Sequence, residues 1–570
     1  MEKWSFKIIC KLLIILTAII ADTAGSKTVE LTSCKTDKYS IVTSVINQGS
    51  SGNENLILWY EERDNGSLFA QKLGSDGSAA WGNYGKKITW NTGYTYEPPM
   101  IFPAPDGGAV IIFSTSPNDK NDISALKINS EGQVTVNKIS LSGDLPGRNY
   151  SPASVVTEHG FIVVAWENFH QDQFDIYAQA IDYNLNKLWN DEQPATVCDY
   201  ENDQRNPTMA TDGRGGVFIT WIDNRNSFLN GSGYSLDLYG NRLDHDGNPY
   251  TNNKGKLLLR NPIYSISGIN STVNPRKEYF YNHNLITSDE NTFMLTAELF
   301  NNEGKTYVKV IKANGDLEIT GEKNITGKTE LRDPRIVSDN NSGGLIIWKD
   351  LANNSNLIKA EHFNKDLLLI SPINGQVLSC EPIKEFSDRI LPDIRLNNSM
   401  KLINNDLYIN WTATDNNRLI LSNMSLTDES DLCGNQSEIQ NRIDEGEFTS
   451  ITTQADKLVV VYKQFNNIFA DVRELRAETK TERTFEQSLS NYPNPFNPST
   501  RINFFIPSDG FVSLRVYDIT GKEIATVLNE FRTMGEHSVR FNAENLSSGA
   551  YFYRLDAGGQ IITRRMTILK

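Results

Sequence analysis

Hydrophobic residues in this chain occur in short runs separated by turns rich in glycine, asparagine and aspartate. The clearest example is Gly213–Asp246. Within it, Val217–Trp221 is an apolar run of β-branched and aromatic residues, and Leu236–Leu243 alternates apolar with polar residues before the Asp246-Gly247 turn. Alternation with a period of two, closed by a turn of this kind, is typical of paired β-strands. The stretch therefore predicts two strands joined by a loop.

Imperfect copies of this unit recur along most of the chain. Each copy has a turn, an apolar run that ends near an aromatic residue, a loop, a second alternating strand and a polar turn. Consecutive run ends are 51 to 76 residues apart, which leaves room for four short strands in each copy. The copy around Ala297 is the least regular, and we expect the end of the repeats to complete the first copy. The eight run ends are Trp59, Phe113, Trp166, Trp221, Ala297, Trp348, Trp411 and Tyr462.

Four-stranded units in series predict an all-β fold. The specific prediction is a β-propeller over residues 26–480, with eight blades, or seven if one copy is over-counted. A lone four-stranded sheet would expose an apolar face, which a neighbouring blade would cover. We therefore expect Trp221 and its counterparts to pack between blades; the alternative is a carbohydrate-stacking platform.

Two further features of the repeats bear on function. Charged residues follow several run ends, and their recurrence favours a structural role over a single catalytic site. The insertion Tyr250–Asn282 is the least repeat-like part, and loops of this kind often carry function. The recurring charged residues are Glu61, Arg63, Glu167, Asp223, Arg225 and Asp350.

The composition changes near Lys480. Residues 481–490 are polar and charged, as is typical of a linker. Residues 491–570 begin with prolines at positions 493, 495 and 498, which hold the chain extended. Six short alternating segments follow, separated by turns such as Ser508–Gly510 and Gly558-Gly559. This pattern predicts an immunoglobulin-like β-sandwich.

Motifs in this last segment resemble, in the same order, those of the type A C-terminal sorting domain of the bacterial type IX secretion system. The resemblance implies that the type IX machinery recognises residues 491–570. It also implies that the protein is secreted across the outer membrane and is extracellular or attached to the cell surface, often after removal of the domain. The preceding repeats resemble, more loosely, secreted bacterial β-propeller proteins. The sorting-motif residues are Tyr492, Pro493, Asn494, Pro495, Phe496, Tyr517, Asp518, Gly521, Gly549, Tyr551 and Lys570.

The N-terminus has the pattern of a targeting segment. Three lysines precede the apolar run Leu12–Ala21, and the small residues Ala24, Gly25 and Ser26 follow it. This order predicts a secretory signal peptide over residues 1–25, with an N-terminal membrane anchor as the alternative. A run of ten residues is too short to span a bilayer, and no later run is long and apolar enough to cross one, so we expect no membrane span in the mature protein.

The net charge restricts the classes of partner that the protein can bind, and the cysteine content restricts the disulfides that it can form. The formal net charge of −15 argues against nucleic acid, because phosphate binding needs clustered Lys and Arg. Four cysteines follow the predicted signal, too few for a disulfide scaffold in a chain of 570 residues. We expect isolated buried thiols, with Cys380–Cys433 as the only pair considered for a disulfide. The four are Cys34, Cys198, Cys380 and Cys433.

No motif for catalysis, cofactor binding or metal binding could be identified. The six histidines form no His-Glu-x-x-His or zinc pattern, and there is no Gly-x-Ser-x-Gly elbow or phosphate-binding glycine loop. Ser75–Trp81 lacks the spacing of a sialidase-type turn. Asp244–Asn248 resembles the start of a calcium loop but lacks the distal glutamate, which favours a hairpin turn. We therefore assign no catalytic, cofactor or metal residue.

The leading functional hypothesis is a secreted or surface-displayed propeller that binds an extracellular glycan or protein. The alternatives are a propeller glycan hydrolase or lyase with unrecognised catalytic residues, and a purely structural surface protein. Unlike, non-repeated carboxylate, Arg and Tyr side chains at one mouth of the channel would favour the enzyme. Repeated residues would favour binding or structure.

Overall fold

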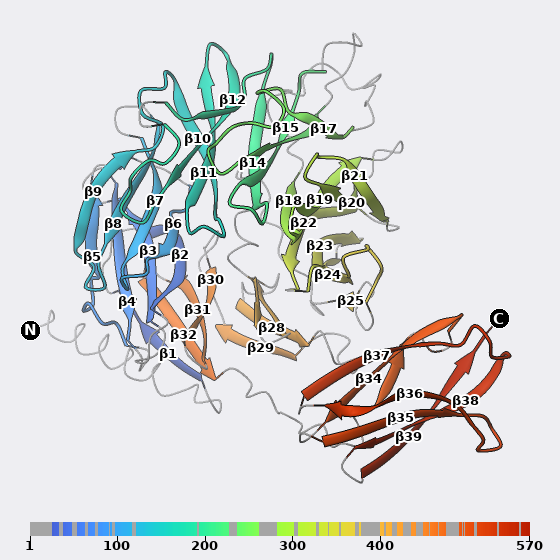
Figure 1. Ribbon diagram of the computed structural model, residues 1–570. Coiled ribbons are helices and arrows are strands. Elements are labelled where there is room, and N and C mark those ends of the chain that lie inside the picture. Colours follow the sequence, from blue (N-terminus) through green and yellow to red (C-terminus); the bar gives the residue numbers. More distant parts are fainter. Residues whose placement is uncertain are drawn as a thin grey trace, which may run out of the picture. The chain divides into compact units, whose positions relative to one another are not determined.

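The protein is built from β-strands, and the part of the chain that the structure describes contains no helix. This computed structural model confirms the all-β prediction. Accordingly, no helix among these residues could cross a membrane. The chain divides into two compact units, Met1–Leu475 and Arg476–Lys570 (Figure 1). The described residues are 26–32, 38–47, 54–62, 66–74, 78–90, 92–93, 97–116, 121–190, 193–226, 236–260, 282–300, 306–326, 330–339, 341–352, 355–370, 376–377, 400–403, 406–412, 419–425, 435–440, 449–454, 457–464, 467–474, 489–492, 494, 496–506, 510–532, 535–557 and 560–569.

The described strands of the first unit form eight four-stranded antiparallel sheets, numbered here in chain order. Sheet 1 contains β2 (Lys38–Asn47), β3 (Glu54–Glu61), β4 (Ser67–Leu73) and β5 (Lys86–Trp90). Sheet 2 contains β6 (Met100–Pro103), β7 (Ala109–Thr115), β8 (Asp122–Ile128) and β9 (Val134–Ser140). Sheet 3 contains β10 (Arg148–Val156), β11 (Ile162–His170), β12 (Gln173–Ile181) and β13 (Ala195–Cys198). Sheet 4 contains β14 (Gln204–Thr211), β15 (Val217–Asp223), β16 (Asp237–Leu243) and β17 (Lys256–Leu259).

The next three sheets follow the same strand order. Sheet 5 contains β18 (His283–Asp289), β19 (Thr292–Phe300), β20 (Thr306–Asn314) and β21 (Ile319–Ile325). Sheet 6 contains β22 (Glu330–Ser338), β23 (Gly344–Ala352), β24 (Ser355–Phe363) and β25 (Gln376–Val377). Sheet 7 contains β26 (Met400–Ile403), β27 (Asp406–Thr412), β28 (Leu419–Ser425) and β29 (Asn435–Gln440).

The two ends of the first unit meet in sheet 8. Its strands β30 (Thr449–Gln454), β31 (Lys457–Gln464) and β32 (Asn467–Glu474) are joined by β1 (Ser26–Glu30), which pairs with β32. We had expected the end of the repeats to complete the first copy, and this was wrong. Sheet 1 has four strands of its own, so the N-terminal strand instead completes the last sheet.

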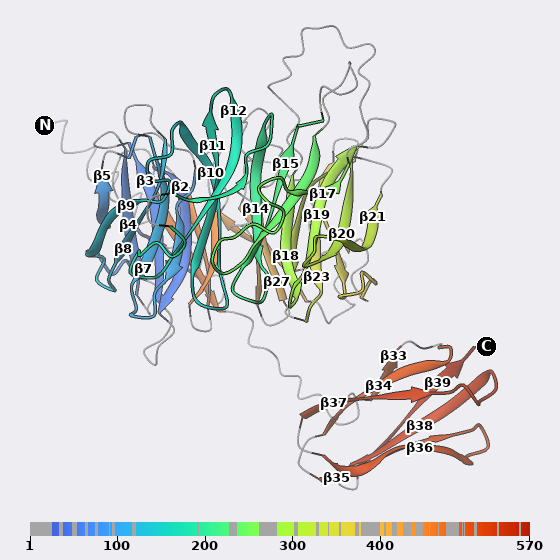
Figure 2. The same cartoon turned by 45° about the horizontal axis from the view of Figure 1, so that its top comes forward.

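Hydrophobic clusters link each sheet of the first unit to the next. Trp221 lies with Val197 of sheet 3 in one cluster, and Val461 of sheet 8 lies with Trp59 of sheet 1 in another. All eight consecutive pairs, including sheets 8 and 1, share such a cluster. Figures 1 and 2 show the sheets following one another around a common centre. The core is therefore divided among the sheet interfaces.

The run ends predicted to pack between sheets are buried. Trp221 is fully inaccessible to solvent, which confirms the packing prediction over the stacking platform at this position. The side chain of Trp411 lies outside the described residues, although its backbone is part of β27. The other buried run ends are Trp59, Phe113, Trp166, Ala297, Trp348 and Tyr462.

The second unit contains two sheets around one core. The smaller sheet has the order β33–β34–β37 and the larger β36–β35–β38–β39. Residues from both sheets, including Ile502, Phe541, Leu514 and Tyr553, form a single hydrophobic cluster. The strands are β33 (Ser490–Tyr492), β34 (Ser499–Ile506), β35 (Gly510–Tyr517), β36 (Glu523–Arg532), β37 (Gly535–Asn542), β38 (Gly549–Ala557) and β39 (Gln560–Ile568).

Candidate functional site

The first sorting motif is anchored to the last strand of the second unit. Phe496 is buried, its backbone N–H donates to the Thr567 carbonyl, and its own carbonyl accepts from Leu569. The Asn494 side chain accepts from the Thr567 N–H at 2.8 Å and donates to the Arg565 carbonyl at 3.3 Å. The motif and the basic end, far apart in sequence, are thus neighbours.

The other motif residues occupy turns and the core. Asp518 begins a turn in which its carboxylate accepts from the backbone of Thr520 and Lys522, and Gly521 supplies the positive φ that the turn requires. Gly549 starts β38 and Tyr551 points into the core. Tyr492 and Tyr517 end β33 and β35. Three motif residues, Pro493, Pro495 and Lys570, lie outside the described residues.

In the first unit, buried glutamates support bulges in the first strands of several sheets. The bulge in β10 places Ser151 at φ 52°, and its backbone N–H donates to the Glu97 carboxylate at 2.6 Å. The bulge in β14 places Asn206 at φ 54°, and its N–H donates to Glu167 at 2.6 Å. A bulge needs a partner for its unpaired backbone group and re-aims the neighbouring side chains.

The third glutamate of this kind is Glu298, which accepts the N–H of Asp333 at 3.0 Å beside the bulge in β22. Burial, reinforced by the negative charge of Asp333, raises the pKa of Glu298 to about 7. Burial likewise raises the pKa values of Glu97 and Glu167. Hydrogen bonds from Ser114 and Ser151 partly oppose this rise at Glu97, and the charge of Arg205 partly opposes it at Glu167. The same use in three places points to a structural device.

The raised pKa of Glu298 predicts a pH-dependent stability. Ionisation of Glu298 disfavours the folded state. The residue therefore contributes most to the free energy of unfolding below about pH 4.5, and this contribution is lost as the pH rises through 7. Glu298→Gln keeps an acceptor for Asp333 but cannot ionise. At pH 8 it should raise the free energy of unfolding by on the order of 3 kcal/mol, and at pH 5 by much less.

Denaturant unfolding at both pH values measures this difference. Glu322→Gln, which replaces an exposed glutamate paired with Lys309 in the same sheet, is the matched control and should change little at either pH. An equal change in the free energy of unfolding by Glu298→Gln at pH 5 and pH 8 would show that the ionisation of Glu298 does not limit stability.

The bulges in β10 and β14 position an aromatic and arginine cluster. The Arg205 guanidinium lies 3.8 Å from the centroid of the Phe174 ring and pairs with the buried Glu167 at 3.1 Å. Phe174 contacts Phe169 at 4.8 Å and Tyr150 at 6.1 Å between ring centroids. Tyr150, Phe169 and Phe174 lie at the same end of sheet 3, near the ends of β10, β11 and β12. Arg205 lies near the start of β14 in sheet 4.

The turn beside this cluster is unusual. Gln171 and Asp172 both have positive φ, 50° and 64°, between His170 and Gln173. A two-residue hairpin turn of this kind normally uses asparagine and glycine. Non-glycine residues in the left-handed region cost free energy and cluster at functional positions. The turn therefore marks this end of sheet 3 as a candidate site.

A second cluster adjoins the first at the same end of sheet 4. The Arg225 guanidinium lies between two tyrosine rings, 4.2 Å from Tyr200 and 4.0 Å from Tyr239. It donates to both carboxylate oxygens of Asp223, at 2.8 and 2.6 Å, and to the Cys198 sulfur at 3.4 Å. These contacts fix the arginine, and the Tyr200 side of the stack is open, with Tyr200 40% exposed.

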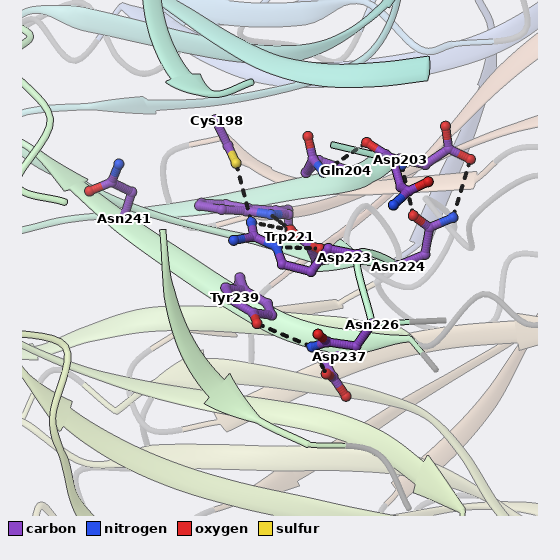
Figure 3. A network of polar contacts seen from close by, with 12 residues as sticks. Cys198, Asp203, Gln204, Trp221, Asp223, Asn224, Asn226, Asp237, Tyr239 and Asn241 are labelled. Carbon is purple, nitrogen blue, oxygen red and sulfur yellow. Dashed lines mark hydrogen bonds and ion pairs between the residues drawn. The ribbon is translucent and has the colours of Figure 1, made fainter. Parts of the chain in front are cut away.

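Amide and carboxylate side chains surround the second cluster, as Figure 3 shows. Asn226 donates to Asp237 at 2.8 Å and to the Tyr239 hydroxyl at 3.3 Å. Asn224 accepts the Asp203 N–H at 2.7 Å, and Asp203 accepts the N–H of Phe174 at 3.1 Å, which joins the two clusters. We call Tyr150, Phe174, Arg205, Tyr200, Arg225 and Tyr239 together the strand-end surface.

One carboxyl beside this surface has an altered acidity. Burial, reinforced by the charges of Asp199 and Asp203 and opposed by a hydrogen bond from Gln173, raises the pKa of Asp175 to about 6. The described residues contain no group of three or more His, Cys, Asp and Glu side chains arranged for a metal ion. Asp175 thus has a pKa in the range useful for proton transfer at this end of sheet 3.

Several residues singled out in the sequence have structural partners. Glu61 and Asp223 accept from the indole N–H groups of Trp59 and Trp221, at 3.0 and 2.9 Å. Asp350 pairs with Lys359 at 2.5 Å. Asp244 accepts from the backbone of Asp246 and Asn248, as a hairpin turn requires.

One expectation needs correction, the expected isolated buried thiol is confirmed at Cys198, and others fall on residues outside the described ranges. The insertion was placed too early, because residues 256–259 form β17 of sheet 4; residues 261–281 lie outside the described residues. Cys198 is a free, buried thiol whose pKa burial raises to about 12, so it stays protonated. The signal peptide, Arg63, Cys34 and the pair Cys380–Cys433 also lie outside the described residues.

Sequence reasoning missed the strand-end surface because its members meet only in the folded chain. Arg225 was noted as a recurring charge, but nothing in the sequence linked it to Tyr200 and Tyr239. The strand β14 begins at Gln204, before Pro207, because the proline sits in the bulge, where it removes no ladder hydrogen bond.

The comparison of sequence families concerns the second unit. Residues 490–569 match the family described as the secretion system C-terminal sorting domain. This module belongs to the type IX secretion system, and it indicates that the protein is secreted across the outer membrane to the cell surface or the extracellular space. None of the curated proteins compared with the chain matches it.

Solved structures resemble the chain only at low identity. The polysaccharide lyase Uly1 has 9% identity and a TM-score of 0.34, with 69% of this chain and 93% of that chain covered. A Trypanosoma rangeli sialidase has 11% identity and a TM-score of 0.32, with 82% and 89% covered. A puromycin hydrolase has 12% identity and a TM-score of 0.40, with 78% and 59% covered. Scores of this size assign no activity to this chain.

Proposed function

We propose that the protein is an exported eight-bladed β-propeller, residues 26–480, joined by the linker 481–490 to an immunoglobulin-like sorting domain, residues 491–570. A signal peptide over residues 1–25 directs it across the inner membrane. The eight four-stranded sheets and the clusters that join each to the next support the blade number. The Tyr551 hydroxyl, which donates to the Ser547 carbonyl at 3.1 Å, supports the immunoglobulin-like assignment, because such domains carry a tyrosine corner.

The propeller binds an extracellular glycan at the strand-end surface. The observation that carries this proposal is the exposed Tyr200 ring, which is stacked on an arginine that is itself fixed by Asp223 and Cys198. A rigid aromatic face gives contact area at little entropic cost, and the neighbouring amides and carboxylates offer partners for hydroxyl groups. Arg205 and Arg225 are both ion-paired, which favours an uncharged glycan over an anionic one.

A glycan hydrolase or lyase is the second candidate. The observation that favours it is the pKa of about 6 at Asp175, which would let this carboxyl donate a proton in mildly acidic solution. The buried glutamates do not add to this candidate. Glu97, Glu167 and Glu298 all accept a bulge N–H, and a catalytic residue would be special to one site.

Pull-down of the mature chain on insoluble cellulose, chitin, xylan and mannan tests the binding proposal. We expect one of these polysaccharides to retain the protein, and Tyr200→Ala to weaken binding about tenfold, or 1.4 kcal/mol. Tyr84→Ala removes a still more exposed tyrosine, from the loop between β4 and β5 of sheet 1, and is the control, with unchanged binding expected. If Tyr200→Ala does not weaken retention of the protein on the polysaccharide, the glycan-binding site lies elsewhere on the protein.

The same polysaccharides separate the two candidates. Release of soluble sugar by the wild type, lost in Asp175→Asn with binding retained, would establish the enzyme. Binding without release supports the proposed binder. Neither binding nor release on any of the four would favour a purely structural surface protein.

A further inference from the structure

The larger sheet of the sorting domain has one face in the core and one face exposed. Its core face carries Leu514 and Val516 of β35, Tyr553 and Leu555 of β38 and Met566 of β39. The alternate residues point away from the core because side chains alternate along a strand. Among them are Arg515, Tyr517, Phe552, Arg554 and Arg565, which we call the arginine face.

The register of the strands brings these side chains together. Arg515 lies opposite Arg554, and Tyr517 lies opposite Phe552, across β35 and β38. Phe552 in turn lies opposite Arg565 across β38 and β39. Two like charges directly opposite each other destabilise a sheet. The face therefore carries a cost for the isolated domain that a negatively charged partner would remove.

The charges of this face are poorly compensated within the domain. Arg515 donates to Ser513 at 3.0 Å and pairs with Glu523 at 3.3 Å, a pair that is about 40% exposed and worth little. Arg554 donates to Thr563 at 3.3 Å and lies 4.9 Å from the Tyr517 ring centroid. Within the described residues, no carboxylate lies within ion-pair distance of Arg554 or Arg565. Both arginines are exposed.

The chain as a whole has the opposite charge. Its formal net charge is −15, whereas residues 490–569 contain eight Lys and Arg against seven Asp and Glu. Three of these eight, Arg515, Arg554 and Arg565, lie with Tyr517 and Phe552 on the arginine face. Arginine and aromatic side chains are the residues most enriched at the energetic centres of protein interfaces.

We propose that the arginine face docks the sorting domain onto an acidic protein surface of the export machinery. The family match says that this domain directs export; the face and the chemistry of its partner are what the strand register and charges add. Complementary charge would speed the encounter and set the orientation, and the aromatic pair would supply the apolar contact. This inference rests on the export role of the domain and is independent of glycan binding by the propeller.

Export of the full chain in a host with the type IX machinery tests the proposal. Arg515→Glu with Arg554→Glu should reduce the exported fraction at least tenfold and leave the protein in the periplasm. Arg515→Lys with Arg554→Lys keeps the charge and should restore most of the export. The matched control is Arg501→Glu with Arg540→Glu, an exposed arginine pair in register across β34 and β37 of the other sheet, which should be exported normally.

Three results would overturn the proposal. Normal export of the Arg515→Glu, Arg554→Glu variant would show that the face is not used. Equal loss in the Arg501, Arg540 control would show that only the total charge of the domain matters. Sedimentation of the wild type, but not the variant, with phosphatidylglycerol vesicles would assign the face to a lipid surface.

Two controls keep the result interpretable. Thermal unfolding of the purified variant should match the wild type; if it does not, Arg515→Gln with Arg554→Gln replaces it, and normal export of that folded variant would also overturn the proposal. Polysaccharide retention by the periplasmic variant should be unchanged. Loss of export with retained binding separates this docking step from the function proposed for the propeller.

Discussion

Removal of Asn491–Lys570 should abolish secretion and leave a folded first unit in the periplasm. The two compact units have separate hydrophobic cores, so the first unit does not need the second for its stability. The proposed signal peptide carries the chain only across the inner membrane, and the sorting domain is required for the second crossing. Cell fractionation of strains that express the full and the shortened chain measures the outcome.

The control for this prediction is the fold of the retained protein. Periplasmic material from the shortened chain should show the same β-sheet circular dichroism and melting temperature as the first unit of the full chain. Appearance of the shortened chain in the medium, without release of a periplasmic marker, would mean that residues 491–570 are a passive module.

Trp221→Ala should lower the free energy of unfolding by about 3–5 kcal/mol, as large aromatic truncations in cores do. The indole is fully buried between sheets 3 and 4, and its N–H donates to Asp223 at 2.9 Å. Gly255, at φ 67°, lies so close to the ring that any Cβ there would clash with it. Truncation would therefore leave a cavity in an interface that has little freedom to collapse.

Two variants distinguish packing from the hydrogen bond. Trp221→Phe keeps an aromatic ring but leaves Asp223 without the indole donor, and it should cost less than the alanine. Trp189→Ala removes a half-buried tryptophan whose indole N–H donates to the His245 carbonyl, and it should cost the least of the three. Denaturant unfolding compares them, and equal effects of Trp221→Ala and Trp189→Ala would contradict the role assigned to Trp221.

The strands were predictable because the signals that define them are local. The run Val217–Trp221 and the alternation up to Leu243 each lie inside one strand, β15 and β16. The turns are local as well: the aspartate that opens a turn accepts from the backbone two and four residues on, as at Asp244 and Asp518. The sorting motif was recognisable for the same reason, since its residues recur in a set order.

The closure of the first unit and the strand-end surface depend on long-range pairing. Nothing near Ser26–Glu30 indicates that this strand pairs with residues 469–473. Likewise, Arg225 meets Cys198 and Tyr200 across the boundary between two sheets, and Arg205 meets Phe174 in the same way. The bulges that aim these side chains are held by glutamates from a neighbouring sheet or the segment that leads into it.

The amino-acid sequence by itself determined the all-β fold, the length of the repeat, the burial of Trp221 and the sorting address, because each of these is carried by residue types at fixed local spacings. Only the tertiary structure decided which strand completes the last sheet, where the aromatic and arginine clusters lie, and which charges remain uncompensated on the sorting domain. The reason is physical: strand formation depends on neighbours in sequence, whereas a binding surface depends on neighbours in space.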